Sequence, residues 1–137
     1  MELQHRLLKL LERSIPDFGA LRMEYPYRPV AEFDLRVADV AAISRDRWIS
    51  VNPDDNLGGA PELVVEARPP SNTARQLREQ AALCLANGCI EFWIVDSGQP
   101  SVTVVRRAGD PIAFRSGEQI PLDAFGGAAL AVGEIFA

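Results

Sequence analysis

Apolar residues recur with helical spacing over positions 2–14, and charged residues fill the positions between them. The apolar stripe consists of Leu3, Leu7, Leu10 and Leu11. Such a pattern predicts a surface helix with one buried face. Pro16, Asp17 and Gly19 follow directly, and residues of these types indicate where the helix ends.

Two strands are predicted next, over residues 20–28 and 33–43. The second becomes continuously apolar at positions 40–43, which favours burial on both faces of a sheet. Residues 44–60 are rich in Asn, Asp, Pro and Gly and predict a long loop. Loops of this length in a compact domain often bind ligands or cover a site.

A third strand, residues 63–66, ends on a carboxylate and leads into a proline-rich turn. Ser71, Asn72 and Thr73 each suit a helix N-cap, and Gly88 suits the position where that helix stops.

Further strands are predicted over residues 90–95 and 102–106, with a shorter one near 112–115. The tail, residues 130–136, is apolar enough to pack on the body of the protein. The resulting order is αβββαβ with an appended C-terminal β-hairpin. This order predicts an α/β (α+β) fold with a mixed central sheet flanked by helices. The second helix permits a parallel crossover between the strands on either side of it.

The chain has 137 residues, which fits a single domain, residues 1–137. It has no apolar run of the roughly 20 residues needed to span a bilayer and no signal-peptide pattern at its start, so we expect a cytoplasmic location. A net charge of −5 argues against non-specific adhesion to nucleic acid. Net charge does not exclude a nuclease, because local patches decide where contact occurs.

Cysteine and histidine are too scarce for several mechanisms. Cys84 and Cys89 are the only cysteines, so a tetrahedral zinc site is disfavoured and buried, inert thiols are expected. His5 is the only histidine, and it falls in the N-terminal helix. A Ser-His-Asp or Cys-His hydrolase is therefore disfavoured.

Glu66 is the first candidate for chemistry, because a carboxylate at the end of a buried strand must be paired or must bind a metal. Arg68 lies two residues further on, and alternate residues of a strand face the same side. Arg68 could therefore stabilise an anionic transition state beside Glu66, or it could be a solvated strand-end arginine. The only lysine, Lys9, is in the N-terminal helix.

Several segments together resemble a known family. They are Arg36-Val37-Ala38-Asp39-Val40-Ala41, Val64-Val65-Glu66, Pro70-Ser71-Asn72-Thr73-Ala74-Arg75, Leu85-Ala86-Asn87-Gly88 and Glu91-Phe92-Trp93-Ile94-Val95-Asp96. In combination they resemble the Uma-type putative restriction endonuclease family of the PD-(D/E)XK nuclease-like superfamily. The likeness extends from about residue 5 to residue 136, and the superfamily core is also αβββαβ.

The resemblance implies a metal-dependent phosphodiester hydrolase acting on nucleic acid, with DNA as the partner and Mg²⁺ or Mn²⁺ as the cofactor. Its Asp and Glu fall on Asp39 and Glu66, whose hard oxygens suit such a cation. Where the family helix usually carries an Asp and then a Lys, this chain has Gln76 and Gln80. Glutamine supplies no positive charge, so we expect a degraded site with weak or no turnover.

The alternative is a non-catalytic binding or regulatory module that keeps the nuclease fold. An edge strand or the apolar tail could also support a homodimer.

Other residues have two interpretations each. Asp54 and Asp55 resemble the family's Pro-Asp, but they lie in the predicted loop, so Asp39 is favoured. Glu62 is either a second acid near the site or, as we favour, a solvated strand start. Trp93 is expected in the core, and Trp48 could stack on a base or, more simply, anchor the loop.

Arg75 and Arg78 lie on the polar side of the second predicted helix. They could contact a nucleic-acid backbone, or they could simply be exposed to solvent.

Overall fold

The computed structural model describes residues 2–30, 35–51, 57–67 and 74–137. The first part of this chain contains α1 (Glu2–Ser14), β1 (Gly19–Arg28), β2 (Arg36–Ser44), α2 (Arg45–Ile49), β3 (Leu57–Gly58), β4 (Leu63–Ala67) and α3 (Ala74–Leu85). The second part contains β5 (Glu91–Asp96), β6 (Ser101–Arg106), β7 (Ile112–Arg115), β8 (Gln119–Pro121), the 3-10 helix η1 (Asp123–Phe125), β9 (Ala129–Ala131) and α4 (Val132–Ile135).

One mixed sheet organises the described residues, with the strand order β3-β1-β2-β4-β5-β6-β7. Its neighbours pair antiparallel except for β1 with β3 and β4 with β5, which are parallel. Helix α3 connects β4 to β5, which is the parallel crossover expected from the sequence. The predicted αβββαβ order is therefore confirmed as α1, β1, β2, β4, α3 and β5, and β6 and β7 extend the sheet beyond it.

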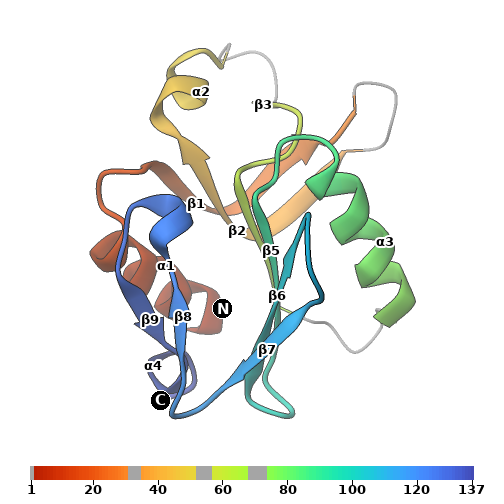
Figure 1. Ribbon diagram of the computed structural model, residues 1–137. Coiled ribbons are helices and arrows are strands. Elements are labelled where there is room, and N and C mark those ends of the chain that lie inside the picture. The colour runs from red at the N-terminus through yellow and green to blue at the C-terminus, as the bar shows by residue number, and fades with distance from the viewer. Residues whose placement is uncertain (1, 31–34, 52–56, 68–73) are drawn as a thin grey trace.

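Helices cover both faces of this sheet, with α1 and the β8–β9 hairpin on one side and α3 on the other (Figure 1). One hydrophobic core, here called the α1-side cluster, lies between α1 and the sheet. It contains Leu7 and Leu11 from α1 and Trp93 from the sheet, all fully buried. Val132 and Ile135 of α4 complete this cluster, so the apolar tail does pack on the body as predicted.

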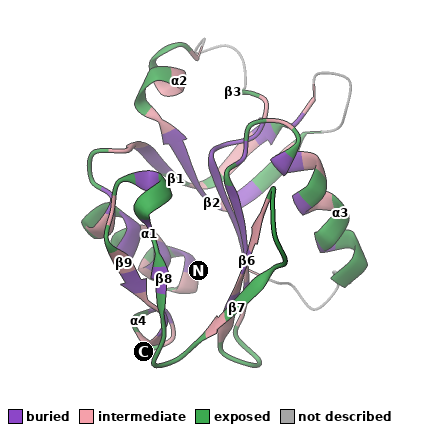
Figure 2. Ribbon diagram, viewed as in Figure 1, coloured by how far each residue is buried: buried purple, intermediate pink, exposed green. Residues whose placement is uncertain are grey.

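The second core, here called the α3-side cluster, lies between the sheet and α3. It includes Tyr27, Val64, Cys84 and Phe92, each fully buried. Helix α3 buries one side and exposes the other, as Figure 2 shows. The chain leaves the helix through Gly88, whose φ of 109° is readily adopted only by glycine, so the predicted stop is confirmed.

Two expectations about the segment before β4 were wrong. Residues 44–60 are not simply a loop, because α2 and β3 form within them; Asp54 and Asp55 lie outside the described residues. Glu62 is not a solvated strand start. It is buried, pairs with Arg47 at 3.1 Å and accepts a hydrogen bond from the backbone N–H of Ser44 at 3.1 Å. A buried carboxylate needs such partners, and the cation comes from the unforeseen helix α2.

The predicted strand over residues 33–43 begins later in the structure, at Arg36, and ends at Ser44; residues 33 and 34 lie outside the described part. Among the described helices, none combines the length and the apolar character needed to cross a membrane.

Candidate functional site

The structure brings Asp39 and Glu66 together on neighbouring strands. β2 and β4 pair antiparallel, with Val40 opposite Val65, and continuing that register places Asp39 beside Glu66. The two carboxyl groups are close enough to share a hydrogen bond. Residues 27 positions apart in the sequence therefore form one acidic site, here called the acid pair.

Neutral amide donors hold each carboxyl group in place. Asp39 Oδ1 accepts a hydrogen bond from Gln4 Nε2 at 2.8 Å, and its Oδ2 accepts one from the backbone N–H of Ala67 at 2.7 Å. Glu66 Oε2 accepts a hydrogen bond from Gln80 Nε2 at 3.1 Å. Since Gln4 comes from α1 and Gln80 from α3, the two helices on opposite faces of the sheet both reach the acid pair.

Electrostatics at the acid pair favour a proton or a cation. The pKa of Glu66 is raised to about 8, first by burial and then by the charge of Asp39 and the hydrogen bond with it. The Gln80 hydrogen bond and the Arg36 charge oppose this shift in the pKa of Glu66. Near neutral pH, without a cation, Glu66 is therefore mostly protonated.

A local distortion of the sheet lies at Asp39. Residues two apart on a regular strand face the same side, yet Ala38 packs in the α3-side cluster and Val40 in the α1-side cluster. On β1, the residue between the pairs Met23–Val40 and Tyr25–Ala38 is Glu24, whose φ is 48°. No other non-glycine among the described residues has a positive φ. Strained backbone of this kind clusters at functional sites, where it aims a side chain.

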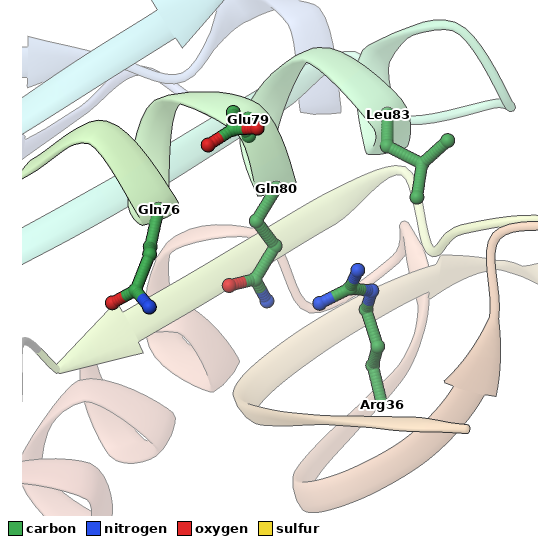
Figure 3. Close-up of a pocket in the computed structure, with 5 residues that line it drawn as sticks. All are labelled: Arg36, Gln76, Glu79, Gln80 and Leu83. Atoms are coloured by element: carbon green, nitrogen blue, oxygen red, sulfur yellow. The ribbon is translucent and has the colours of Figure 1, made fainter. Parts of the chain in front are cut away.

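Beside the acid pair is a groove of about 580 Å³, here called the α3 groove. It is lined by Arg36, Gln76, Glu79, Gln80 and Leu83. In Figure 3 the guanidinium of Arg36 and the amide of Gln80 point toward each other across it. Because Gln80 also touches Glu66, the groove opens next to the carboxyl groups.

Next to Gln80, the side chains of Tyr27 and Cys84 are fully buried between α3 and the sheet. The Tyr27 hydroxyl and the Cys84 sulfur are 3.3 Å apart, and both residues are fully buried. Burial raises the pKa of the Cys84 thiol and that of the Cys89 thiol. Both cysteines are thus buried and protonated, as the sequence indicated, and His5 is exposed on α1.

The remaining sequence candidates are placed as follows. Arg68 lies outside the described residues. Arg75 and Arg78 are exposed on α3, and Arg75 pairs with Glu79 at 3.6 Å. Trp93 is fully buried, as expected, and donates its indole N–H to Glu91.

Trp48 is partly buried on α2, beneath the guanidinium of Arg22 and next to Tyr25. These contacts anchor α2 to β1, in agreement with the interpretation of Trp48 as an anchor of this segment.

Sequence reasoning missed two residues of the site, Gln4 and Arg36. Gln4 is three residues before Leu7 on the buried stripe of α1, and a polar residue on such a stripe is a usable signal. In the sequence, Arg36 stands out only as part of the segment that resembles the family. Its place in the α3 groove follows from the path of β2 next to α3, which no local pattern reveals.

Among the described residues, no cluster of three or more His, Cys, Asp or Glu side chains could hold a metal ion. A cation at this site would therefore depend on the two carboxylates of the acid pair, with other oxygen ligands completing its shell.

Known proteins similar to this chain include nuclease-like ones. In a crystal structure described as a putative nuclease belonging to DUF820 from Anabaena variabilis ATCC 29413, the fold matches with a TM-score of 0.80. That match covers 98% of this chain and 78% of the other at 16% sequence identity, so it shows a shared fold. No curated protein is significantly similar to this chain. The model of the Uma2 family, described as "Putative restriction endonuclease", matches residues 2–133, and the chain therefore belongs to that family.

Proposed function

We propose that this protein is a divalent-metal-dependent endonuclease that hydrolyses phosphodiester bonds of nucleic acid, with DNA as its substrate. Asp39 and Glu66 are its proposed ligands for Mg²⁺ or Mn²⁺. The observation that supports this proposal is the contact between two carboxyl groups at a largely buried site, which raises the pKa of Glu66 to about 8. Structural carboxylates are normally paired with a cation, whereas these two face each other.

The donor set suits a hard divalent cation. Carboxylate oxygens are the ligands that Mg²⁺ prefers, and two of them leave coordination positions for water and for phosphate oxygen. A cation held by these two carboxylates would make a bound water more acidic and would neutralise charge on the phosphate. Gln4 and the backbone N–H of Ala67 orient Asp39, while Gln80 orients Glu66.

Hydrolysis is proposed to be slow, because α3 provides no charge where the family helix usually does. Gln76 and Gln80 share one face of α3 and line the groove as neutral amides. Neither can stabilise the developing negative charge as a cation does. Arg68 remains a candidate for this role.

A non-catalytic binding module is the second candidate. It is favoured by the hydrogen bond from Gln80 to Glu66, which satisfies the carboxyl group with a neutral donor that needs no metal. In that case the α3 groove binds a partner without chemistry. A homodimer stays a prediction, which a size measurement in solution would test.

Thermal unfolding during a Mn²⁺ titration separates these two functions. Metal that binds the native state stabilises it by mass action, so a concentration of one hundred Kd raises the melting temperature by roughly 5–10 °C. We expect this rise for the wild type and for Glu79→Ala, which removes an exposed acid of the same groove. We expect no rise for Glu66→Ala. A wild type that Mn²⁺ does not stabilise would refute the metal site and favour the binding module.

A further inference from the structure

A positive charge enters the α3 groove from β2. The family's helix lysine has no counterpart on α3, and the only lysine, Lys9, is in α1. Arg36 starts β2, three residues before Asp39, and its guanidinium enters the α3 groove beside Gln80 (Figure 3). A cation is thus present in the groove, supplied by a strand instead of the helix.

Arg36 differs from the other partly buried arginines of the described chain. Arg6 donates to the Ile135 carbonyl, Arg47 to two carbonyls and Glu62, and Arg106 to Glu91. The Nε of Arg36 is buried and has no hydrogen-bond partner among the described residues. A buried donor without an acceptor is unfavourable, so structural arginines normally have one.

Among the described residues that line the α3 groove, none forms an ion pair with Arg36. Glu79, the acidic residue lining the groove, pairs with Arg75 on the exposed side of α3. Gln76 and Gln80 are uncharged, and each can offer an amide N–H to an oxygen ligand. Arg36 is near enough to Glu66 and Cys84 for its charge to oppose the rise that burial causes in the pKa of each. The groove therefore has a guanidinium and two amides next to the acid pair.

We infer that Arg36 is a phosphate-binding residue that holds a phosphodiester of a nucleic-acid strand in the α3 groove, next to Asp39 and Glu66. A guanidinium suits phosphate because its planar N–H groups match two phosphate oxygens. The inference rests on the proposed function in assigning the same groove to nucleic acid. It does not depend on a metal or on turnover, because phosphate binding by Arg36 needs neither.

The test uses Glu66→Gln protein in EDTA, where neither the metal nor the Glu66 carboxylate contributes to binding. The probe is a short fluorescein-labelled single-stranded DNA, and anisotropy gives Kd over a range of salt concentrations. Adding Arg36→Ala should weaken binding about tenfold, as expected for one charged hydrogen-bonded contact. It should also reduce the slope of log Kd against log salt by about 0.7, the value for one phosphate contact of a single strand.

The matched control is Arg115→Ala, which removes one exposed arginine from β7. That strand is separated from β2 by β4, β5 and β6. It should leave both the Kd and the salt slope close to those of the parent. Arg36→Lys keeps the charge and should recover part of the affinity lost in Arg36→Ala. Circular dichroism of each variant checks that it is folded.

The outcomes separate this inference from the proposed function. Parent protein that does not bind the DNA, or an Arg36→Ala loss no larger than that of Arg115→Ala, overturns the role of Arg36 even if Mn²⁺ stabilises the wild type. If Arg36→Ala itself does not fold, Arg36→Gln, which also removes the charge, decides: a Kd and a salt slope both unchanged from the parent overturn the inference. A specific Arg36 effect in a protein that Mn²⁺ does not stabilise supports phosphate binding while the metal site fails.

Discussion

Replacing Glu66 with glutamine should change how the stability of the protein depends on pH. In the folded protein without metal the pKa of Glu66 is raised from 4.5 to about 8, first by burial and then by Asp39. The unfolded chain therefore releases this proton at lower pH than the folded chain does. Between about pH 4.5 and pH 8 the folded state binds more protons, so the free energy of unfolding falls as the pH rises.

The size of this effect follows from the shift in the pKa. One pKa unit corresponds to about 1.4 kcal/mol, so raising the pH through the whole interval lowers the free energy of unfolding by about 5 kcal/mol. By pH 7 the loss is about 3 kcal/mol. Below pH 4.5 both states hold the proton and above pH 8 neither does, so the contribution is constant outside the interval.

Urea unfolding in EDTA, repeated across this pH range, measures the effect. Other carboxyl groups also titrate, so the informative quantity is the free energy of unfolding of the wild type minus that of Glu66→Gln. This difference should fall by about 1.4 kcal/mol per pH unit between about pH 5 and pH 8. Glu79→Gln is the matched control, since it changes an exposed acid of the same groove. A wild-type-minus-Glu66→Gln difference that stays constant with pH would refute the reasoning.

Two further predictions concern helices α3 and α2. Gln80→Lys, alone or with Gln76→Asp, should raise Mn²⁺-dependent cleavage of DNA, because it restores a cation beside Glu66; equal cleavage by these variants and the wild type would place the defect elsewhere. Arg47→Met should lower the free energy of unfolding by about 3 kcal/mol, because it leaves the buried Glu62 without its cation. Urea unfolding measures this loss against Arg45→Met, an exposed neighbour that should change stability by less than about 1 kcal/mol.

The order of helices and strands could be predicted from the sequence because its determinants are local. Leucines at helical spacing, a continuous apolar run at positions 40–43 and the stop at Gly88 each act within a few residues. Helix α2 could not be predicted in this way, because it has only five residues and no buried side chain, so no apolar periodicity marks it. The burial of Glu62 was missed for the same reason, since its partner Arg47 lies on that short helix.

At the candidate site, the sequence determined which residue types are available, and the tertiary structure decided which of them meet. Asp39 and Glu66 came from the sequence as a resemblance and a strand-end carboxylate, but their contact required the antiparallel register of β2 and β4. Gln4 and Arg36 join them only because α1 and the start of β2 converge on the same end of the sheet. Local periodicity specifies which side of an element is buried, whereas the distance between two such sides depends on how the whole chain packs.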